Sequence, residues 1–478
     1  MEEFSKVKRN SFFYLVSTTS RLVSNAILFI IVARHYGTEI YGSFTVAHTL
    51  SSFALVLADF GFDLLIISEI AQRIEDAEKI FLKFLPLKLI LCILAFGILI
   101  ISTMFIPTNP LTNELILIFA FNMFFTALTN NFFAFFRGLE KFYVEAKISF
   151  VINVLILIAV WIGSLSSINV ILIALIILSA RIIGFILVNR EYLITYSFRK
   201  VGPKFSQFKG DLKKSAIFGI HLLFGTLYFQ IDTILLVVLK GETEAGLYQS
   251  VFKLLVIILV VPELIIGTLF PTVTRMFSSG SGDWKSSVKF AFKILFLICL
   301  PACLIMGLYP EAIIKIVYAH KEYLPAQEIL RISALVIFVR FIAEPFAMML
   351  TAANKQTIRT IIVVIATILN VTLNLIFIPT WGAKGAIIIS VVTNLFAFIA
   401  YFIFSPSRSL KMILDHKLLA TLFISAVLGY LLLQTVKLTI FMFIPVFLFL
   451  YSTFVLSFIL TKNEKEFIFS LKGLRLRS

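Results

Sequence analysis

Charged residues are scarce in this sequence. Only 14% of the 478 residues are Asp, Glu, Lys or Arg, whereas soluble proteins carry about 25%. Hydrophobic residues make up 60% of the chain, and the mean hydropathy is +1.02. This composition provides too little polar surface to cover a chain of this length in water. It therefore excludes a soluble globular domain and predicts an integral membrane protein.

The motifs of several common enzyme and metal sites are also missing. The chain has no P-loop, no HExxH, no GxSxG and no acidic metal-binding loop, which argues against ATP hydrolysis and a hydrolase site. The few cysteines, Cys92, Cys299 and Cys303, all fall in apolar segments and are interpreted as packing residues. We therefore expect no catalytic residues, no metal and no cofactor.

What the chain has in abundance is long apolar runs. A helix needs roughly 20 apolar residues to cross a bilayer, and about fourteen runs approach that length. The sequence thus predicts an all-α integral membrane fold. The expected spans are residues 12–33, 44–67, 81–105, 115–136, 142–164, 168–188, 216–239, 247–270, 288–308, 329–352, 358–378, 386–404, 418–434 and 438–460.

The net charge of +16 is distributed as in a membrane protein. Most Lys and Arg residues fall on the side of the membrane that holds the N-terminus, which is the pattern of cytoplasmic segments. We therefore predict a multi-pass protein of the cell membrane with both termini in the cytoplasm. A nucleic-acid partner is not expected.

A basic segment that contains Gly202, Pro203 and Gly210 divides the predicted spans into two sets. We expect an N-terminal six-helix bundle over 1–195, a cytoplasmic linker over 196–215 and a C-terminal six-helix bundle over 216–410. Two additional helices and a basic tail fill 411–478.

A weak internal repeat supports this division. GTEIYGSF at 37–44 resembles GETEAGLY at 241–248, and the two glycines of each copy have the same spacing. Each copy follows the first predicted span of its half. The halves are therefore expected to share one membrane orientation and to be related by an axis along the membrane normal.

Polar residues recur at helical spacing inside several apolar spans. Two interpretations stay open: the stripes line a common wet cavity, or they hold neighbouring helices together. The stripe residues are Ser17, Ser24 and Asn25 beside Arg21 on the first span, Asn122 on the fourth, and Asn370 and Asn374 on the eleventh.

Charged residues deep inside the predicted spans are mostly cationic. Arg21, Lys253 and Arg340 are candidates for a cavity that binds an anion, although Glu344 is a potential partner for Arg340. Asp232 and His221 on the seventh span are candidates for ion coupling, and Asp232 is alternatively a counter-ion for Arg21 or Lys253. Three further cations, Lys88, Arg181 and Lys293, are placed near span ends and are expected to extend to the interface.

Several segments resemble the polysaccharide flippases of the Wzx type, in the superfamily that also holds multidrug and toxin extruders and lipid II flippases. They are ARHYGTEIYGSF, ADFGFDLLIISEIA, AGLYQSVFKL, LFPTVTRM, LTAANKQ and NVTLNLIFIPTWGAKGAIIIS. The resemblance covers roughly residues 5 to 460.

This resemblance implies two six-helix bundles around a central cavity that opens alternately to each side. The implied passenger is a polyprenyl-pyrophosphate-linked oligosaccharide, flipped from the inner to the outer leaflet for export of a cell-surface polysaccharide such as O-antigen or capsule. A polysaccharide polymerase and glycosyltransferases are the implied partners. Family members have cationic residues in this cavity, and Arg21, Lys253 and Arg340 are the positions here that suit this role. Asp232 occupies the place of the acid on the seventh helix of similar sequences.

Alternatives remain at this stage. An ion-coupled multidrug extruder would bind organic cations, and the few acids inside the spans argue against it. A membrane polymerase or glycosyltransferase would need a large outside loop with catalytic residues, whereas the predicted outside loops are short. The sequence does not distinguish a proton gradient from a sodium gradient as the energy source.

Overall fold

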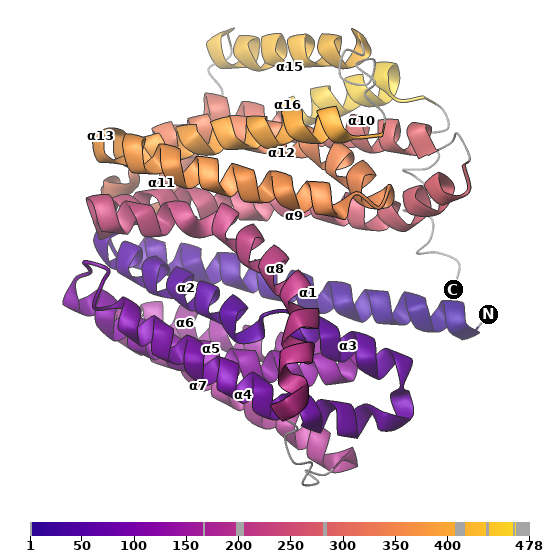
Figure 1. Ribbon diagram of the computed structural model, residues 1–478. Helices are drawn as coiled ribbons and strands as arrows, with labels where there is room; N and C mark the ends of the chain where they lie inside the picture. The colour runs from indigo at the N-terminus through magenta and orange to yellow at the C-terminus, as the bar shows by residue number, and fades with distance from the viewer. Residues whose placement is uncertain are drawn as a thin grey trace. The chain divides into compact units, whose positions relative to one another are not determined.

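A computed structural model describes residues 2–165, 168–196, 205–280, 284–406, 416–435, 439–461 and 464 (Figure 1). These residues form helices and no strands, which confirms the all-α prediction. The helices are α1 Glu2–His35, α2 Thr38–Asp59, α3 Phe62–Gln72, α4 Ala77–Ser102, α5 Pro110–Gly138, α6 Phe142–Leu165, α7 Val170–Thr195, α8 Phe205–Lys240, α9 Glu242–Ser278, α10 Trp284–Leu308, α11 Pro310–Tyr318, α12 Ala326–Ala352, α13 Gln356–Phe404, α15 His416–Thr435 and α16 Ile440–Phe454. Short helical turns lie at Ile74–Asp76, Lys321–Tyr323 and Val455–Ile459.

Twelve helical segments of the described chain are long and apolar enough to cross a membrane. The sequence predicted about fourteen such spans, and two features account for the difference. Helix α13 is 49 residues long and contains two of the predicted spans. The apolar part of α15, His416–Leu432, is shorter than a typical span.

The long helix α13 bends at Gly382, where the backbone has φ 55° and ψ −140°. A side chain is disfavoured in this conformation, so glycine suits the bend. The carboxylate of Glu244 accepts a hydrogen bond of 2.7 Å from Ala383 N. It thereby satisfies one of the free N–H groups at the start of the second arm of α13. The TWGAKGA segment thus joins two spans by a capped kink.

A second break separates α2 from α3, within the single span predicted at 44–67. Phe60 and Gly61 both adopt left-handed conformations, with φ of 42° and 81°. The side chain of Asp59 accepts hydrogen bonds from Gly61 N at 3.3 Å and Asp63 N at 3.1 Å. Because Asp59 satisfies N–H groups at the start of α3, the helix restarts immediately after the break.

The chain forms two compact units by its internal contacts. The first comprises Met1–Ile257, Val317–Tyr323 and Thr367–Ala386, and the second comprises Ile258–Ile316, Leu324–Ala366 and Ile387–Ser478. Within the first unit, α1 packs on α6, α2 on α5, and α5 on α7. The division into halves at 195 and 216 stays a prediction.

The repeat glycines bring two helices of the first unit into backbone contact. A Cβ atom added to Gly42 of α2 would lie 1.9 Å from Glu242 O, and one added to Gly246 of α9 would lie 2.1 Å from Thr38 O. No side chain fits at such distances. The second glycines of the two repeat copies therefore face each other and permit this crossing.

The second unit has an aromatic core built by α10, α12 and α16. Phe292, Phe346, Phe443 and Phe447 are buried in it, and the stacked rings of Phe443 and Phe447 have their centroids 5.3 Å apart.

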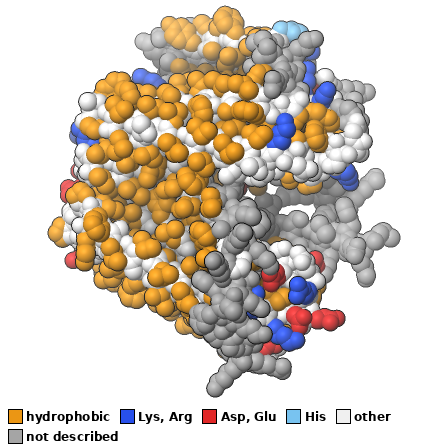
Figure 2. Space-filling view, viewed as in Figure 1, with side chains coloured by type: hydrophobic (Ala, Val, Ile, Leu, Met, Phe, Trp, Pro, Cys, Tyr) orange, Lys and Arg blue, Asp and Glu red, His pale blue; other side chains and the backbone are white. Residues whose placement is uncertain are grey.

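The outer surface is also apolar: hydrophobic side chains cover most of the described surface in view in Figure 2. A surface this apolar is suited to lipid rather than water.

Candidate substrate cavity

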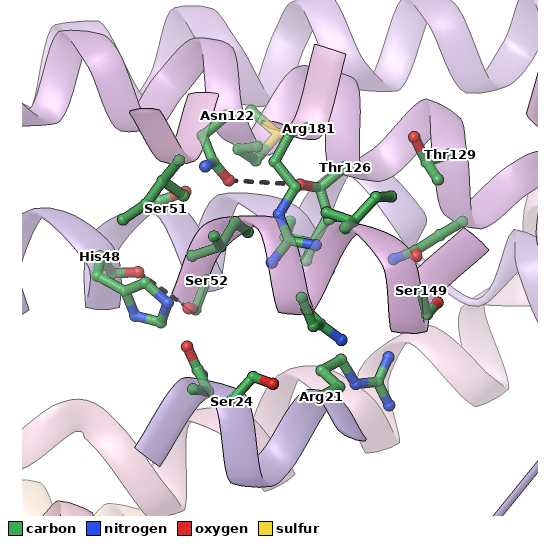
Figure 3. A pocket seen from close by; sticks show the side chains of 18 of the residues that line it. Arg21, Ser24, His48, Ser51, Ser52, Asn122, Thr126, Thr129, Ser149 and Arg181 are labelled. Atoms are coloured by element: carbon green, nitrogen blue, oxygen red, sulfur yellow. Dashed lines mark hydrogen bonds between the residues drawn. The ribbon is translucent and has the colours of Figure 1, made fainter. Parts of the chain in front are cut away.

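A cavity of about 300 Å³ lies inside the first unit, between α1, α2, α5, α6 and α7 (Figure 3). Each of these helices is apolar on most of its surface and turns a short polar stretch inward. The lining residues are Arg21, Ser24, Asn25, Leu28, His48, Ser51, Ser52, Leu55, Phe119, Asn122, Met123, Thr126, Thr129, Asn130, Phe133, Ser149, Ile152, Asn153, Ile156, Ile177 and Arg181.

Two arginines give the cavity a positive charge. Arg21 comes from α1 and Arg181 from α7, and the side chain of Arg181 reaches the centre of the cavity in Figure 3. The lining set contains no Asp or Glu, and among the described residues Arg181 Nε has no hydrogen-bond partner although it is buried. A guanidinium group in such a site favours an anion with several oxygen atoms, such as a phosphate.

Apart from the imidazole of His48, the rest of the polar lining consists of hydroxyl and amide groups. Some of them bond to their own helices: Thr126 Oγ1 donates to Asn122 Oδ1 at 3.3 Å, and Ser52 Oγ donates to His48 O at 2.9 Å. Amides and hydroxyls both donate and accept hydrogen bonds. Such groups suit the hydroxyls of a sugar.

The cavity contains four of the predicted site residues: Arg21, Ser24, Asn25 and Asn122. Ser17, predicted in the same stripe, is not among the lining residues. It is buried and donates to Glu145 Oε1 at 3.0 Å. Ser17 therefore joins α1 to α6, which is the helix-binding role that the sequence left open.

Two predicted cavity cations have other surroundings. Lys253 Nζ lies 3.8 Å from the centre of the Phe29 ring, in a cation–π contact between α9 and α1. Arg340 belongs to the second unit, where its Nε donates to Asn394 Oδ1 at 2.9 Å. Neither residue is among those that line the cavity of the first unit, and their predicted role in binding the passenger stays a prediction.

Asp232, Asn370 and Asn374 form a second polar cluster within the first unit. Asp232 is 2% exposed; its Oδ2 accepts from Tyr248 Oη at 2.6 Å, and its Oδ1 accepts from Asn374 Nδ2 at 2.8 Å. Asn374 Nδ2 also lies 3.1 Å from Asn370 Oδ1. The cluster thus joins α8, α9 and α13. His221 lies on α8, and its side chain is outside the part of the chain that is described.

Sequence reasoning missed Arg181 and His48 as cavity residues and gave Arg181 and Lys88 the wrong surroundings. The predicted span ended at residue 188, which put Arg181 near its end, but α7 continues to Thr195. Lys88 is 1% exposed and lies 2.8 Å from both Asp59 Oδ1 and Asp63 Oδ1. The expected extension of Arg181 and Lys88 to the interface is therefore wrong.

Lys293, the third cation expected near an interface, is partly buried in the second unit. Its Nζ lies 2.7 Å from Glu464 Oε2 and donates to Ile459 O at 3.0 Å. Glu464 follows the last span, which ends at Ile459. This ion pair therefore lies near the end of a span.

Comparison with known proteins gives two family matches. Residues 7–277, more than half of the chain, match the family described as polysaccharide biosynthesis protein. Residues 218–376 match the family described as MatE. A membrane protein of Methanocaldococcus jannaschii, itself uncharacterized, is 26% identical over 257 residues, which are 50% of this chain. The matching part spans about half of that relative, 48% of its length.

Solved structures show the same fold at low sequence identity. The lipid II flippase MurJ, in an inward closed conformation, has a TM-score of 0.70 at 15% identity over 94% of this chain and 100% of its own. An inward-facing multidrug resistance transporter of the MATE family, in the MOP superfamily, has a TM-score of 0.67 at 15% identity, over 80% of this chain and 93% of its own. A MOP superfamily transporter from Pyrococcus furiosus has a TM-score of 0.59 at 15% identity, over 85% and 96% of the two chains. The chain is thus a multi-pass membrane protein of the polysaccharide biosynthesis family, with the fold of the MOP superfamily transporters.

Proposed function

We propose that this protein flips polyprenyl-pyrophosphate-linked oligosaccharides from the inner to the outer leaflet of the cytoplasmic membrane. The observation that carries this proposal is the cavity of the first unit, which is lined by Arg21 and Arg181 and by no acid. A pyrophosphate carries about two negative charges, and moving it bare through hydrocarbon would cost tens of kcal/mol. Fixed guanidinium groups reduce that cost.

The neutral polar lining supports the same passenger. The hydroxyl and amide groups of Ser24, Asn25, Asn122 and Asn130 surround the arginines, so the pyrophosphate and the first sugars have complementary partners in one place. The cavity is too small for a long oligosaccharide together with its lipid. We therefore expect it to bind the pyrophosphate and adjoining sugars, while the polyprenyl chain stays in the bilayer.

Transport would proceed by alternating access, in which the passenger favours the state that exposes it to the other side. Asp232 is the acid proposed to respond to a proton or sodium gradient or to act as a counter-ion. Its carboxyl group is buried and accepts hydrogen bonds from Tyr248 and Asn374. We place both termini in the cytoplasm, and we propose that a polymerase and glycosyltransferases act before and after this step.

The second candidate is an extruder of organic cations, which the MatE match over 218–376 favours. Such a passenger would need acids or aromatic faces in the binding site. The cavity of the first unit instead presents two arginines. The charge of this cavity therefore supports the flippase over the extruder.

The test is depletion of the protein in its host, followed by quantification of polyprenyl-pyrophosphate oligosaccharides on each membrane face. We expect accumulation on the cytoplasmic face, with rescue by the wild type and by Arg73→Ala, a change at an exposed arginine outside the cavity. Arg21→Ala and Arg181→Ala should fail to rescue. An unchanged distribution of lipid-linked sugars, together with lost efflux of cationic dyes, would instead support the extruder.

A further inference from the structure

The break between α2 and α3 holds a cluster of charged side chains that is separate from the cavity. Lys88 of α4 lies 2.8 Å from Oδ1 of Asp59 and 2.8 Å from Oδ1 of Asp63. The lysine side chain is 1% exposed, while the two acids are 17% and 15% exposed. Two largely buried carboxylates thus share one buried ammonium group.

The charges of this cluster do not balance. Two carboxylates and one ammonium leave a net charge of −1, and an uncompensated charge in such a site is costly. The other groups that face Asp63 from α4 and α5 are Cys92 and Asn131, which add no positive charge. Arg137, further along α5, is engaged by Glu145.

Helix α8 also packs against the break. A Cβ added to its Gly219 would lie 2.8 Å from Phe60 O, so only a small residue fits there. The side chain of His221, two residues further along α8, lies outside the described part of the chain. The described residues around the cluster therefore supply one ammonium group for two carboxylates.

A second observation indicates what is missing. Asn131 of α5 is fully buried, and its Nδ2 lies 3.4 Å from Asp63 Oδ1. Its Oδ1 is buried without a hydrogen-bond partner among the described residues. A buried carbonyl oxygen without a donor is destabilising. The cluster thus has one negative charge in excess and one acceptor that lacks a donor.

We infer that this cluster binds one proton, which is carried by the Asp63 carboxyl group and shared with Asn131 Oδ1. A proton from water adds to the carboxylate oxygen, no other bond changes, and the net charge of the cluster goes from −1 to zero. The new O–H group donates to the free amide oxygen. A sodium ion fits less well, because the Lys88 ammonium already occupies the place between the carboxylates.

The position of the cluster connects it to the cavity. Leu55 of α2 lines the cavity, and Asp59 lies one helical turn further along the same helix, where it caps α3. Protonation at Asp63 therefore changes the charge at the end of a helix that forms a cavity wall. The proton site itself does not depend on which passenger the cavity binds.

Infrared spectroscopy of the purified full chain in nanodiscs of zwitterionic lipid tests the inference, because a protonated carboxyl group has its own carbonyl band. We expect this band in the wild type at pH about 6, where an ordinary Asp with a pKa of about 4 is ionised. Asp63→Asn should lose the band. Asp59→Asn should lose the band as well. In this variant Asp63 is the one carboxylate that faces Lys88, so the cluster is already neutral and binds no proton.

Two further variants keep the test decisive. Asn131→Leu removes the amide that contacts Asp63 and should shift the titration of the band by about one pH unit or more, which remains measurable if Asp63→Asn fails to fold. Glu75→Gln, at an exposed acid of the same unit, should leave the band unchanged. The inference is overturned if the wild type lacks the band at pH about 6, or if the band persists in Asp63→Asn. Loss of the band on adding sodium at constant pH would assign the site to sodium instead.

Discussion

Two arginine side chains determine the charge of the cavity. Arg181 is the deeper of the two sites, because its Nε is buried and lacks a hydrogen-bond partner among the described residues, whereas Arg21 is more exposed. A buried guanidinium with free donor capacity gains more from an incoming anion than one that is already solvated. Arg181 is therefore expected to contribute the larger part of passenger binding.

Replacing Arg181 by Ala should weaken binding of a polyprenyl-pyrophosphate ligand about 10- to 100-fold, since a hydrogen bond to a charged group contributes about 1.5–3 kcal/mol. Arg181→Lys should recover only part of the affinity, because lysine lacks the planar fork that binds two oxygens. Binding is measured by titration of the purified protein. Arg190→Ala on the same helix, outside the cavity lining, is the matched control, and equal affinity for Arg181→Ala and wild type would contradict the role.

Asp232 has a structural role that is separate from any coupling role. Asp232→Ala would remove one hydrogen bond from Tyr248 Oη and one from Asn374 Nδ2, and each hydrogen bond contributes about 0.5–1.5 kcal/mol to stability. The free energy of unfolding should fall accordingly, while Asp76→Ala, at a half-exposed acid, should change it little. Denaturant unfolding in detergent measures both, and an unchanged stability of Asp232→Ala would exclude this structural role.

Helix crossings and kinks follow from a few small or capping residues. Gly42 and Gly246 permit the contact of α2 with α9, Gly382 permits the bend of α13, and Glu244 satisfies the N–H group that follows the bend. The repeat in the sequence identified both glycine turns. It did not show that the two copies meet, because that depends on how the helices pack.

Gly246→Ala should destabilise the protein by about 1–3 kcal/mol, the usual cost of overpacking, because its new methyl group would overlap with Thr38 O. Gly97→Ala in α4 is the matched control, since no atom lies within 4 Å of the added Cβ. This control should be neutral or stabilising by up to about 1 kcal/mol, as alanine favours helix over glycine. Equal unfolding free energies for the two variants would refute the close crossing.

Glu244→Ala should loosen the start of the second arm of α13. Loss of a capping side chain costs about 0.5–2 kcal/mol, and Ala383 N would lose its acceptor. Hydrogen–deuterium exchange should increase at residues 383–386 and stay unchanged in Thr380→Ala, whose hydroxyl bonds only within its own helix. Unchanged exchange in Glu244→Ala would show that this carboxylate does not hold the kink.

At the scale of the whole molecule, the sequence predicted the all-α class and most of the spans. It did not predict the features that depend on how the helices pack against each other. Apolar runs predicted the spans well, since hydropathy and length are local properties. The surroundings of Arg181 and Lys88 were predicted wrongly, because the cavity that Arg181 lines and the acids that pair with Lys88 depend on how the helices pack. Three residues of the Arg21 stripe line the cavity, namely Arg21, Ser24 and Asn25. The buried partners of Ser17 and Asp232 come from helices far away in the sequence.

The most direct test of the flippase account is transport by the purified protein in liposomes that contain a polyprenyl-pyrophosphate oligosaccharide. Its movement between leaflets is followed by accessibility to a membrane-impermeant sugar oxidant. We predict transfer by the wild type and by Arg190→Ala, and loss of transfer in the double variant Arg21→Ala/Arg181→Ala, which removes both cavity cations. Equal transfer with and without the protein, or undiminished transfer by the double variant, would contradict the account.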